Sequence, residues 1–179
     1  IVPSVAGVIS GTGTTATVDW SSNYSGQAEI TVQGVNSCGN GPSSAIFTVQ
    51  INPLPGKPAT PQGTTQLCQN PPNSVYTTTG GSNATSYQWS VSPSTAGTIT
   101  GNGLNGTIDW NNNFTGIAVI SVRGINSCGN GIFSDGIVVT VHTLPVVNLG
   151  PDITICASQS VTLDAGNFGA TYLWSTGAT

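Results

Sequence analysis

The chain of 179 residues repeats its own sequence at an offset of 90 positions, which limits it to folds built from copies of one unit. Across residues 1–55 and 91–145, about half of the positions are identical. The clearest copy is the run Asn-Ser-Cys-Gly-Asn-Gly, which occupies residues 36–41 and recurs letter for letter at residues 126–131. Identity at this level does not arise by chance, so the two regions are expected to share one fold.

A weaker similarity relates the parts of the chain that this offset leaves over. Leu67-Cys68, followed by Tyr87-Gln88-Trp89-Ser90, resembles Ile155-Cys156, followed by Tyr172-Leu173-Trp174-Ser175. The sequence therefore predicts the C-terminal half of one repeat (1–55), a complete repeat (56–145) and the N-terminal part of a further repeat (146–179). Such a frame is typical of a segment taken from a longer polypeptide. Proline-rich stretches at residues 52–58 and 144–145 fall where one repeat passes to the next and are expected to stiffen the joints.

Within the complete repeat, the apolar pattern favours strands over helices. Tyr87, Trp89 and Val91 alternate with polar residues, which is the period of two expected of a half-buried strand. Short β-branched runs are separated by Gly and Asn pairs such as Asn102-Gly103 and Asn105-Gly106, which favour turns. About seven short strands with turns every ~8–12 residues predict an all-β fold of tandem antiparallel β-sandwich repeats of ~90 residues. The expected core residues are the four tryptophans, Trp20, Trp89, Trp110 and Trp174.

The charge composition excludes several classes of partner. Lys57 and Arg123 are the only basic residues beside six acids, and charged residues make up 4% of the chain against roughly 25% in ordinary globular proteins. A chain with so few cations cannot neutralise nucleic-acid phosphates or anionic lipid head groups. Its apolar runs are also far shorter than the ~20 residues of a spanning helix, so neither nucleic-acid binding nor membrane insertion is expected. Neutral polar Thr, Ser, Asn and Gly are typical of secreted and surface proteins.

The four cysteines suggest a disulfide framework. In the complete repeat the order is Cys68, Trp89, Cys128, as in immunoglobulin-like sandwiches, where two such cysteines bond across the core. The sequence therefore predicts a Cys68–Cys128 disulfide, which would contribute roughly 4 kcal/mol by closing a loop of about 60 residues. Cys38 and Cys156 would have partners outside this segment. No two cysteines lie close enough in sequence for a zinc motif, so no metal is expected at them.

The ordered motifs resemble those of a known family. Residues 84–91 (Ala-Thr-Ser-Tyr-Gln-Trp-Ser-Val), 107–110 (Thr-Ile-Asp-Trp) and 126–129 (Asn-Ser-Cys-Gly) are similar to PKD-like repeats of very large secreted proteins of Bacteroidetes. Residues 149–179 resemble related Ig-like modules of the same proteins. The resemblance implies a cell-surface or secreted multidomain protein, often an adhesin, sometimes linked to gliding motility and exported by type IX secretion. It implies no catalytic residues and no cofactor.

The residue inventory argues against an enzyme. Nucleophilic catalysis needs a base beside its Ser or Cys, and the only histidine is His142, which takes the place of Asn52 in the other copy. Asp19 and Asp109 are counterparts in different repeats, so they are interpreted as structural rather than as a catalytic pair. Asp152 and Asp164 could supply oxygen ligands to calcium near a repeat junction, although solvated acids at strand ends are the favoured interpretation.

Three hypotheses for function follow from the sequence. The leading one is a structural or adhesive segment, a stalk or filament, of a giant extracellular surface protein, whose partners are neighbouring repeats and further surface glycans or proteins. The second is a carbohydrate-binding accessory module of a polysaccharide-degrading enzyme, with an aromatic platform formed by Trp20, Trp110, Tyr24 and Phe114. Recurrence of these residues in both copies favours a core role instead. The third is a filament subunit in which one chain completes the half-repeat of the next by strand complementation, with Cys156 bonded to Cys38 of a neighbour.

Overall fold

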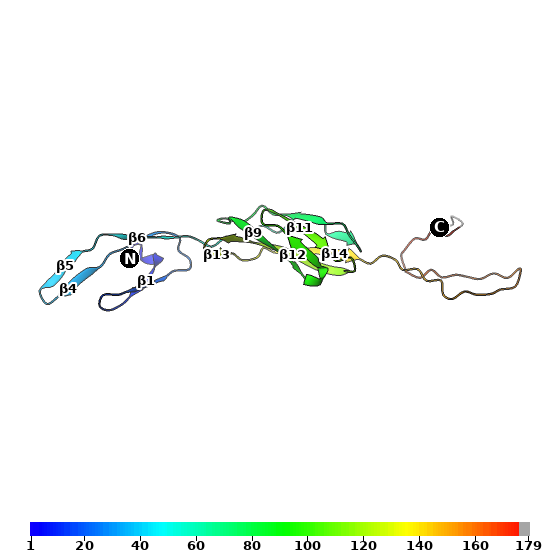
Figure 1. The fold of residues 1–179 in the computed structure, drawn as a ribbon, viewed down its shortest axis with the longest axis horizontal. Coiled ribbons are helices and arrows are strands. Elements are labelled where there is room, and N and C mark those ends of the chain that lie inside the picture. The colour runs from blue at the N-terminus through cyan, green and yellow to red at the C-terminus, as the bar shows by residue number, and fades with distance from the viewer. Residues whose placement is uncertain (176–179) are drawn as a thin grey trace.

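A computed structural model describes residues 1–175 and shows three parts arranged in a row (Figure 1). The described residues contain strands and two short 3-10 helices, η1 (Ser4–Ala6) and η2 (Ser94–Ala96), and no α-helix. None of them forms a helix with the length and apolar character needed to span a bilayer. The protein is an all-β molecule whose middle part is the largest ordered body.

The middle part is a β-sandwich. One sheet has three strands in the order β10-β11-β8, and the other has the order β13-β12-β14-β7, with β9 also paired to β12. Pairing is antiparallel except between β14 and β7, the last and first strands, which run parallel. The strands are β7 (Gln66–Cys68), β8 (Ser74–Thr77), β9 (Ser86–Ser92), β10 (Gly97–Thr100), β11 (Asn105–Trp110), β12 (Gly116–Asn126), β13 (Gly129–Asn130) and β14 (Ile137–His142).

Strand β12 is the centre of this sandwich because it pairs with β9, β13 and β14. Its side chains alternate as a strand between core and solvent requires: Ala118, Ile120 and Val122 are fully buried, whereas Ile117 and Val119 are exposed. The buried set joins side chains from the facing sheet in one continuous core, whose largest members are Tyr76, Trp89, Ile108, Trp110, Val139 and Val141.

Trp89 on β9 fixes how closely the two sheets approach. Its indole Nε1 donates a hydrogen bond to the Gly103 carbonyl over 3.1 Å, and its ring lies against Gly106, where any Cβ would collide with it. Gly106 is therefore not part of a turn, as the Asn105-Gly106 pair predicted, but the second residue of β11. Glycine is required there because the indole occupies the side-chain position.

The first part contains the counterparts of only the later strands of the sandwich. It forms three separate two-stranded sheets, with pairs β1-β2, β3-β6 and β4-β5. The segment equivalent to β12 is divided here into two strands, β3 and β4, because no neighbour spans the break. The strands are β1 (Gly7–Ser10), β2 (Thr17–Trp20), β3 (Gly26–Ile30), β4 (Gln33–Asn36), β5 (Gly39–Ser43) and β6 (Phe47–Ile51).

The last part, residues 146–175, forms no strand. Its single buried hydrophobic residue is Ala165, while many larger apolar side chains are exposed. The exposed ones include Val146, Leu149, Ile153, Ile155, Val161, Leu163, Phe168 and Leu173. Apolar side chains in this part therefore lie without a partner sheet.

The Cys68–Cys128 disulfide predicted from the sequence is not present, and the topology explains why. All four cysteines are exposed and unbonded. Cys68 pairs with His142, just beyond the Gly116 end of β12. Cys128 lies in the turn that follows Asn126, at the other end of β12. The length of β12 separates them by about 30 Å at a rise of about 3.3 Å per residue, whereas a disulfide needs Cα atoms within about 7 Å.

We predict that reduction does not change the stability of the middle part. The urea midpoint, followed by tryptophan fluorescence, should be the same with and without reductant, and the Cys68→Ser variant should match the parent chain. A loss of about 4 kcal/mol on reduction, the size expected for closing so long a loop, would contradict the unbonded arrangement.

Tyr76 makes the stability of the sandwich depend on pH in the alkaline range. The side chain is fully buried, and its hydroxyl donates a hydrogen bond of 2.7 Å to the Thr64 carbonyl. Burial raises the pKa of Tyr76 from 10.0 to about 12, because the phenolate would lose its hydration. The folded state therefore favours the neutral phenol, and the stability that this provides is fully present below about pH 10 and lost as pH rises to about 12.

We expect the free energy of unfolding of the parent chain to fall between about pH 10 and 12, with a shallower fall in Tyr76→Phe, which cannot ionise at this position. Urea titrations at a series of pH values measure both slopes. Equal slopes for the parent and the variant would show that Tyr76 does not carry this dependence.

Candidate functional site: a hairpin that holds the interdomain linker

The repeated Asn-Ser-Cys-Gly-Asn-Gly run forms the hairpin between β12 and β13, and it holds the segment that enters the sandwich. The Asn126 Oδ1 accepts a hydrogen bond of 2.9 Å from the Cys128 amide, which closes the turn. The Asn126 Nδ2 donates to the Pro53 carbonyl (2.9 Å) and to the Asn83 carbonyl (3.0 Å). One side chain thus joins the turn, the loop before β9 and the segment that leads into the sandwich. We call this segment, residues 52–58, the linker. We call this hairpin, residues 124–131, the clasp.

Two glycines of the clasp leave room for the linker. A Cβ on Gly124 would lie 2.8 Å from the Cβ atoms of both Ala84 and Pro55, and one on Gly131 would lie 2.5 Å from the Pro55 carbonyl oxygen. Contacts this short do not occur between real atoms, so a side chain at either position would push the linker out. Pro55 is buried as a result, in a segment that composition alone would place in solvent.

Further bonds continue the attachment along the linker. The Gly56 amide donates to the Ser82 carbonyl over 2.8 Å. The Lys57 ammonium lies 2.7 Å from the Asp135 carboxylate, but both side chains are well exposed, so this ion pair contributes little to stability. The linker is therefore held by the Asn126 side chain, by the Gly56 backbone bond and by the close fit of Pro55 into the clasp.

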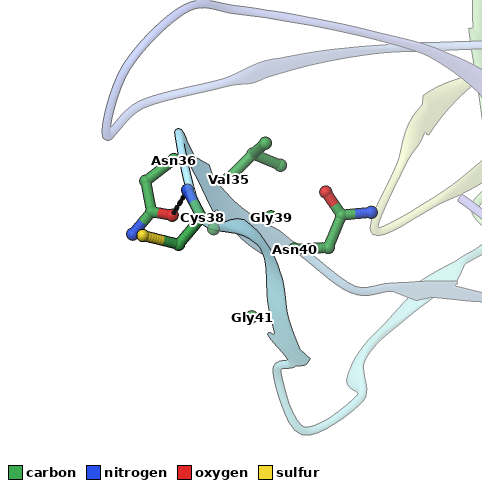
Figure 2. A pocket seen from close by; sticks show the side chains of 7 residues that line it. Val35, Asn36, Cys38, Gly39, Asn40 and Gly41 are labelled. Atoms are coloured by element: carbon green, nitrogen blue, oxygen red, sulfur yellow. Dashed lines mark hydrogen bonds between the residues drawn. The ribbon is translucent and has the colours of Figure 1, made fainter.

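The first part carries the same hairpin, between β4 and β5. Residues 34–41 line a hollow of about 500 Å³, and Figure 2 shows Asn36 bonded only to its own turn, through the Cys38 amide (2.8 Å). A Cβ added to Gly34 would have no atom within 4 Å, and one added to Gly41 would meet only the Gly34 carbonyl oxygen at 3.5 Å. The hollow corresponds in position to the space that Pro55 occupies in the middle part.

The aromatic residues considered for a sugar platform lie in different settings. Trp110 is only 4% exposed, stacks on Phe114 with ring centroids 6.4 Å apart, and donates its Nε1 to the Ser74 hydroxyl over 3.1 Å. A buried indole cannot stack on a sugar. Trp20 and Tyr24 are half-buried and line a hollow of about 440 Å³ beside residues 51–54. Trp89 lies in the core, and Trp174 is half-buried.

The remaining candidate residues are not brought together. His142 Nε2 lies 2.6 Å from the Gln66 Oε1 at the exposed end of β14. Asp152 is exposed, and the Asp164 carboxylate accepts a bond from the Gly166 amide within its own turn (2.8 Å). Among residues 1–175, no three His, Cys, Asp or Glu side chains lie close enough together to hold a metal ion. The calcium hypothesis therefore gains no support here.

Comparison with known proteins assigns the middle part. Residues 54–138 match the family model of the PKD-like domain. This region is therefore similar to PKD-like domains, and we refer to it below as the PKD-like domain. No curated protein matches the chain significantly. The matched region begins at Leu54, so it includes the Leu54-Pro55 linker that the clasp holds.

Sequence reasoning missed the role of the clasp, although its signal was present. The run at residues 36–41 and 126–131 is the longest stretch without a single difference between the copies, and its glycines and asparagines recur with it. From the sequence, that identity indicated only a repeat, whereas in the structure the asparagine and the glycines around the cysteine hold the linker.

The clasp can be tested against its own unfilled copy. Asn126→Ala removes two bonds to the linker and its loop, and should lower the free energy of unfolding of the PKD-like domain by about 1–2 kcal/mol. Gly131→Ala should cost about 1–3 kcal/mol because Pro55 must move. Urea unfolding measures both changes.

The matched controls are Asn36→Ala and Gly41→Ala, where the same changes meet open space. They should leave the unfolding of the PKD-like domain unchanged. If Asn126→Ala and Gly131→Ala likewise left it unchanged, the clasp would not hold the linker.

Proposed function

We propose that this chain is a non-catalytic, load-bearing and adhesive segment of tandem PKD-like repeats in a large extracellular bacterial surface protein. The 90-residue repeat and the PKD-like match of residues 54–138 support a tandem structural module. The finer context, an adhesin-type protein of Bacteroidetes exported by type IX secretion, rests on the resemblance of the repeated motifs. Neighbouring repeats are its first partners, and surface glycans or other surface proteins are the proposed targets of the whole protein.

The observation that carries the mechanical part of this proposal is the arrangement of the terminal strands. The chain enters the domain at the clasp, beside the Asn126 end of β12, and leaves it beyond His142, at the Gly116 end. The first strand, β7, pairs in parallel with the last strand, β14. Tension between entry and exit therefore pulls β7 and β14 in opposite directions along their length.

In that geometry the hydrogen bonds between the terminal strands are loaded together, in shear, rather than one after another. They include the Thr140 amide to the Thr65 carbonyl (2.8 Å) and the Gln69 amide to the His142 carbonyl (2.7 Å). The clasp adds a second attachment, because tension on the linker must also withdraw Pro55. Both features suit a module that transmits force along a string of repeats.

The surface composition is consistent with an extracellular setting. Few ionised side chains and many Thr, Ser and Asn residues leave a neutral polar surface with a net charge of -4. Such a surface avoids nonspecific attraction to nucleic acid and anionic lipid, and supports contacts made by hydrogen bonds rather than by charge.

Single-molecule stretching of the chain from its two ends tests this proposal. The PKD-like domain should unfold in one step at a high force, and Gln69→Pro, which removes one donor between the terminal strands, should lower that force clearly. Ile108→Ala, a core change in β11 that costs about 2–4 kcal/mol at equilibrium, should lower it less. If the unfolding forces of the two variants only followed their free energies of unfolding at equilibrium, the load-bearing role would be contradicted.

A further inference from the structure

Arg123 is a cation without an acidic partner on the outer face of the larger sheet of the PKD-like domain. It follows the fully buried Val122 on β12, so its side chain lies on the opposite face of that strand, where it is half-buried. Among residues 1–175, the one ion pair joins the other basic residue, Lys57, to Asp135. The positive charge of Arg123 is therefore not neutralised within the described part of the chain.

Two neighbours hold the Arg123 side chain against the sheet. Its Nε donates a hydrogen bond of 2.8 Å to the Gln88 Oε1 on the adjacent strand β9. Its Cζ lies 4.8 Å from the centre of the Phe133 ring, in the loop before β14, and the aromatic face attracts the guanidinium. These contacts use Nε alone, and neither Nη group has a bonded acceptor among residues 1–175. A guanidinium fixed in this way loses little further entropy when it binds a ligand.

The fold of a repeat does not require this arrangement. The run at residues 126–131 is identical in both copies, but three positions close to it in the chain differ in residue type between the copies. They change from Gln33 to Arg123, from Pro42 to Ile132 and from Ser43 to Phe133. Two of the three changes supply the cation and the ring that contact each other. The pair is therefore a surface feature of the PKD-like domain alone.

The free part of the guanidinium determines which ligand chemistry fits. With Nε bound to Gln88, the two Nη groups form a planar pair of donors that matches the two oxygens of a carboxylate. Ser121 and Ser90 pair across β12 and β9 on the same face, about 7 Å along the strands from Arg123. Phe133, which is 40% exposed, adds an apolar surface beside the cation. The face thus combines one cation with hydroxyl groups and part of an aromatic ring.

Size and charge favour a sugar over a protein as the ligand of this face. A stable protein interface involves about 20–30 residues on each side, whereas the cation, the ring and the polar groups beside them are five residues. A peptide with several carboxylates would need several cations, and the only other Lys or Arg, Lys57, is paired with Asp135. A glycan with isolated carboxylates needs one cation, and its C–H groups are attracted to the negative face of an aromatic ring.

We propose that the outer face of β9 and β12 binds a glycan that contains a uronic acid, with the sugar carboxylate on the two Nη groups of Arg123. Phe133 contacts an apolar face of the sugar, and the Ser90 and Ser121 hydroxyls bond its hydroxyl groups. Gln88 is a positioning residue that holds the guanidinium. This inference rests on the proposed extracellular, adhesive role, and it names the chemical class of the surface glycan involved.

The test is a titration of the purified 179-residue chain with a hyaluronan tetrasaccharide, followed by the NMR shifts of the backbone amides. The control ligand is the same tetrasaccharide with its carboxylates reduced to alcohols. The expected result is saturable shifts centred on residues 88–90 and 121–123, weakened by salt, with binding of the reduced sugar about tenfold weaker or less. Absence of shifts at this face, or equal affinity for the reduced sugar, would overturn the proposal.

Substitutions test the site from the side of the protein. Arg123→Gln, which introduces the residue of the first copy, should abolish binding, and Arg123→Lys, which keeps the charge but not the paired donors, should weaken it about tenfold. Phe133→Ser should also weaken it. Lys57→Gln is the matched control, since it removes the other cation, and should bind as the parent chain does. Urea unfolding checks that each variant is folded, and unchanged affinity in Arg123→Gln would refute the site.

A short polyglutamate peptide serves as the competing ligand. Tighter binding of this peptide than of the acidic sugar would show a peptide site and overturn the sugar assignment. Arg123 takes no part in the pairing of β7 with β14, so Arg123→Gln should unfold at the same force as the parent chain. Loss of sugar binding with the predicted stretching behaviour intact would refute this inference alone, and a low unfolding force with sugar binding intact would refute the load-bearing role alone.

Discussion

The structure depends on the pairing of β9 with β12. β12 buries Ala118, Ile120 and Val122 on one face, and β9 places Trp89 across the same core. The chain itself provides the comparison, because residues 1–55 are about half identical to residues 91–145 and lack any counterpart of β9. There the long strand is divided in two and the sheets separate into pairs. A strand face that cannot be covered does not hold the sheets together, however similar its sequence.

This dependence also explains how repeats connect. The linker ahead of β7 is held by the clasp, through Asn126 and two glycines. Because the clasp belongs to the late strands and the linker to the early ones, holding the linker also closes the domain. The entry point lies at one end of β12 and the exit at the other, so consecutive repeats extend in a line, as Figure 1 shows.

The strands could be predicted from local sequence patterns. The features that could not be predicted depend on contacts between residues far apart in the sequence. Alternation at residues 87–91 predicted strand β9, because side chains on one face of a strand recur every second residue. The order Cys68, Trp89, Cys128 gave no information on where each cysteine lies along its strand, and the structure does not show the predicted disulfide because the two cysteines lie near opposite ends of β12. Asn105-Gly106 was assigned to a turn because the indole that requires Gly106 comes from another strand. The clasp joins Asn126 to Pro53, which lies 73 positions away, and no local period encodes such a contact.

Amide hydrogen exchange at Val122 and Val32, in a dilute monomeric chain, tests the central role of β9 most directly. Both amides donate to an equivalent serine hydroxyl, Ser134 or Ser44, over 3.1 Å, so their own hydrogen bonds are alike. Only Val122 is covered by β9. The account predicts exchange at Val122 that is slower by orders of magnitude, limited by unfolding of the whole domain, with rapid exchange at Val32. Similar protection at the two amides would contradict it, because the half-repeat would then be held together without the strand.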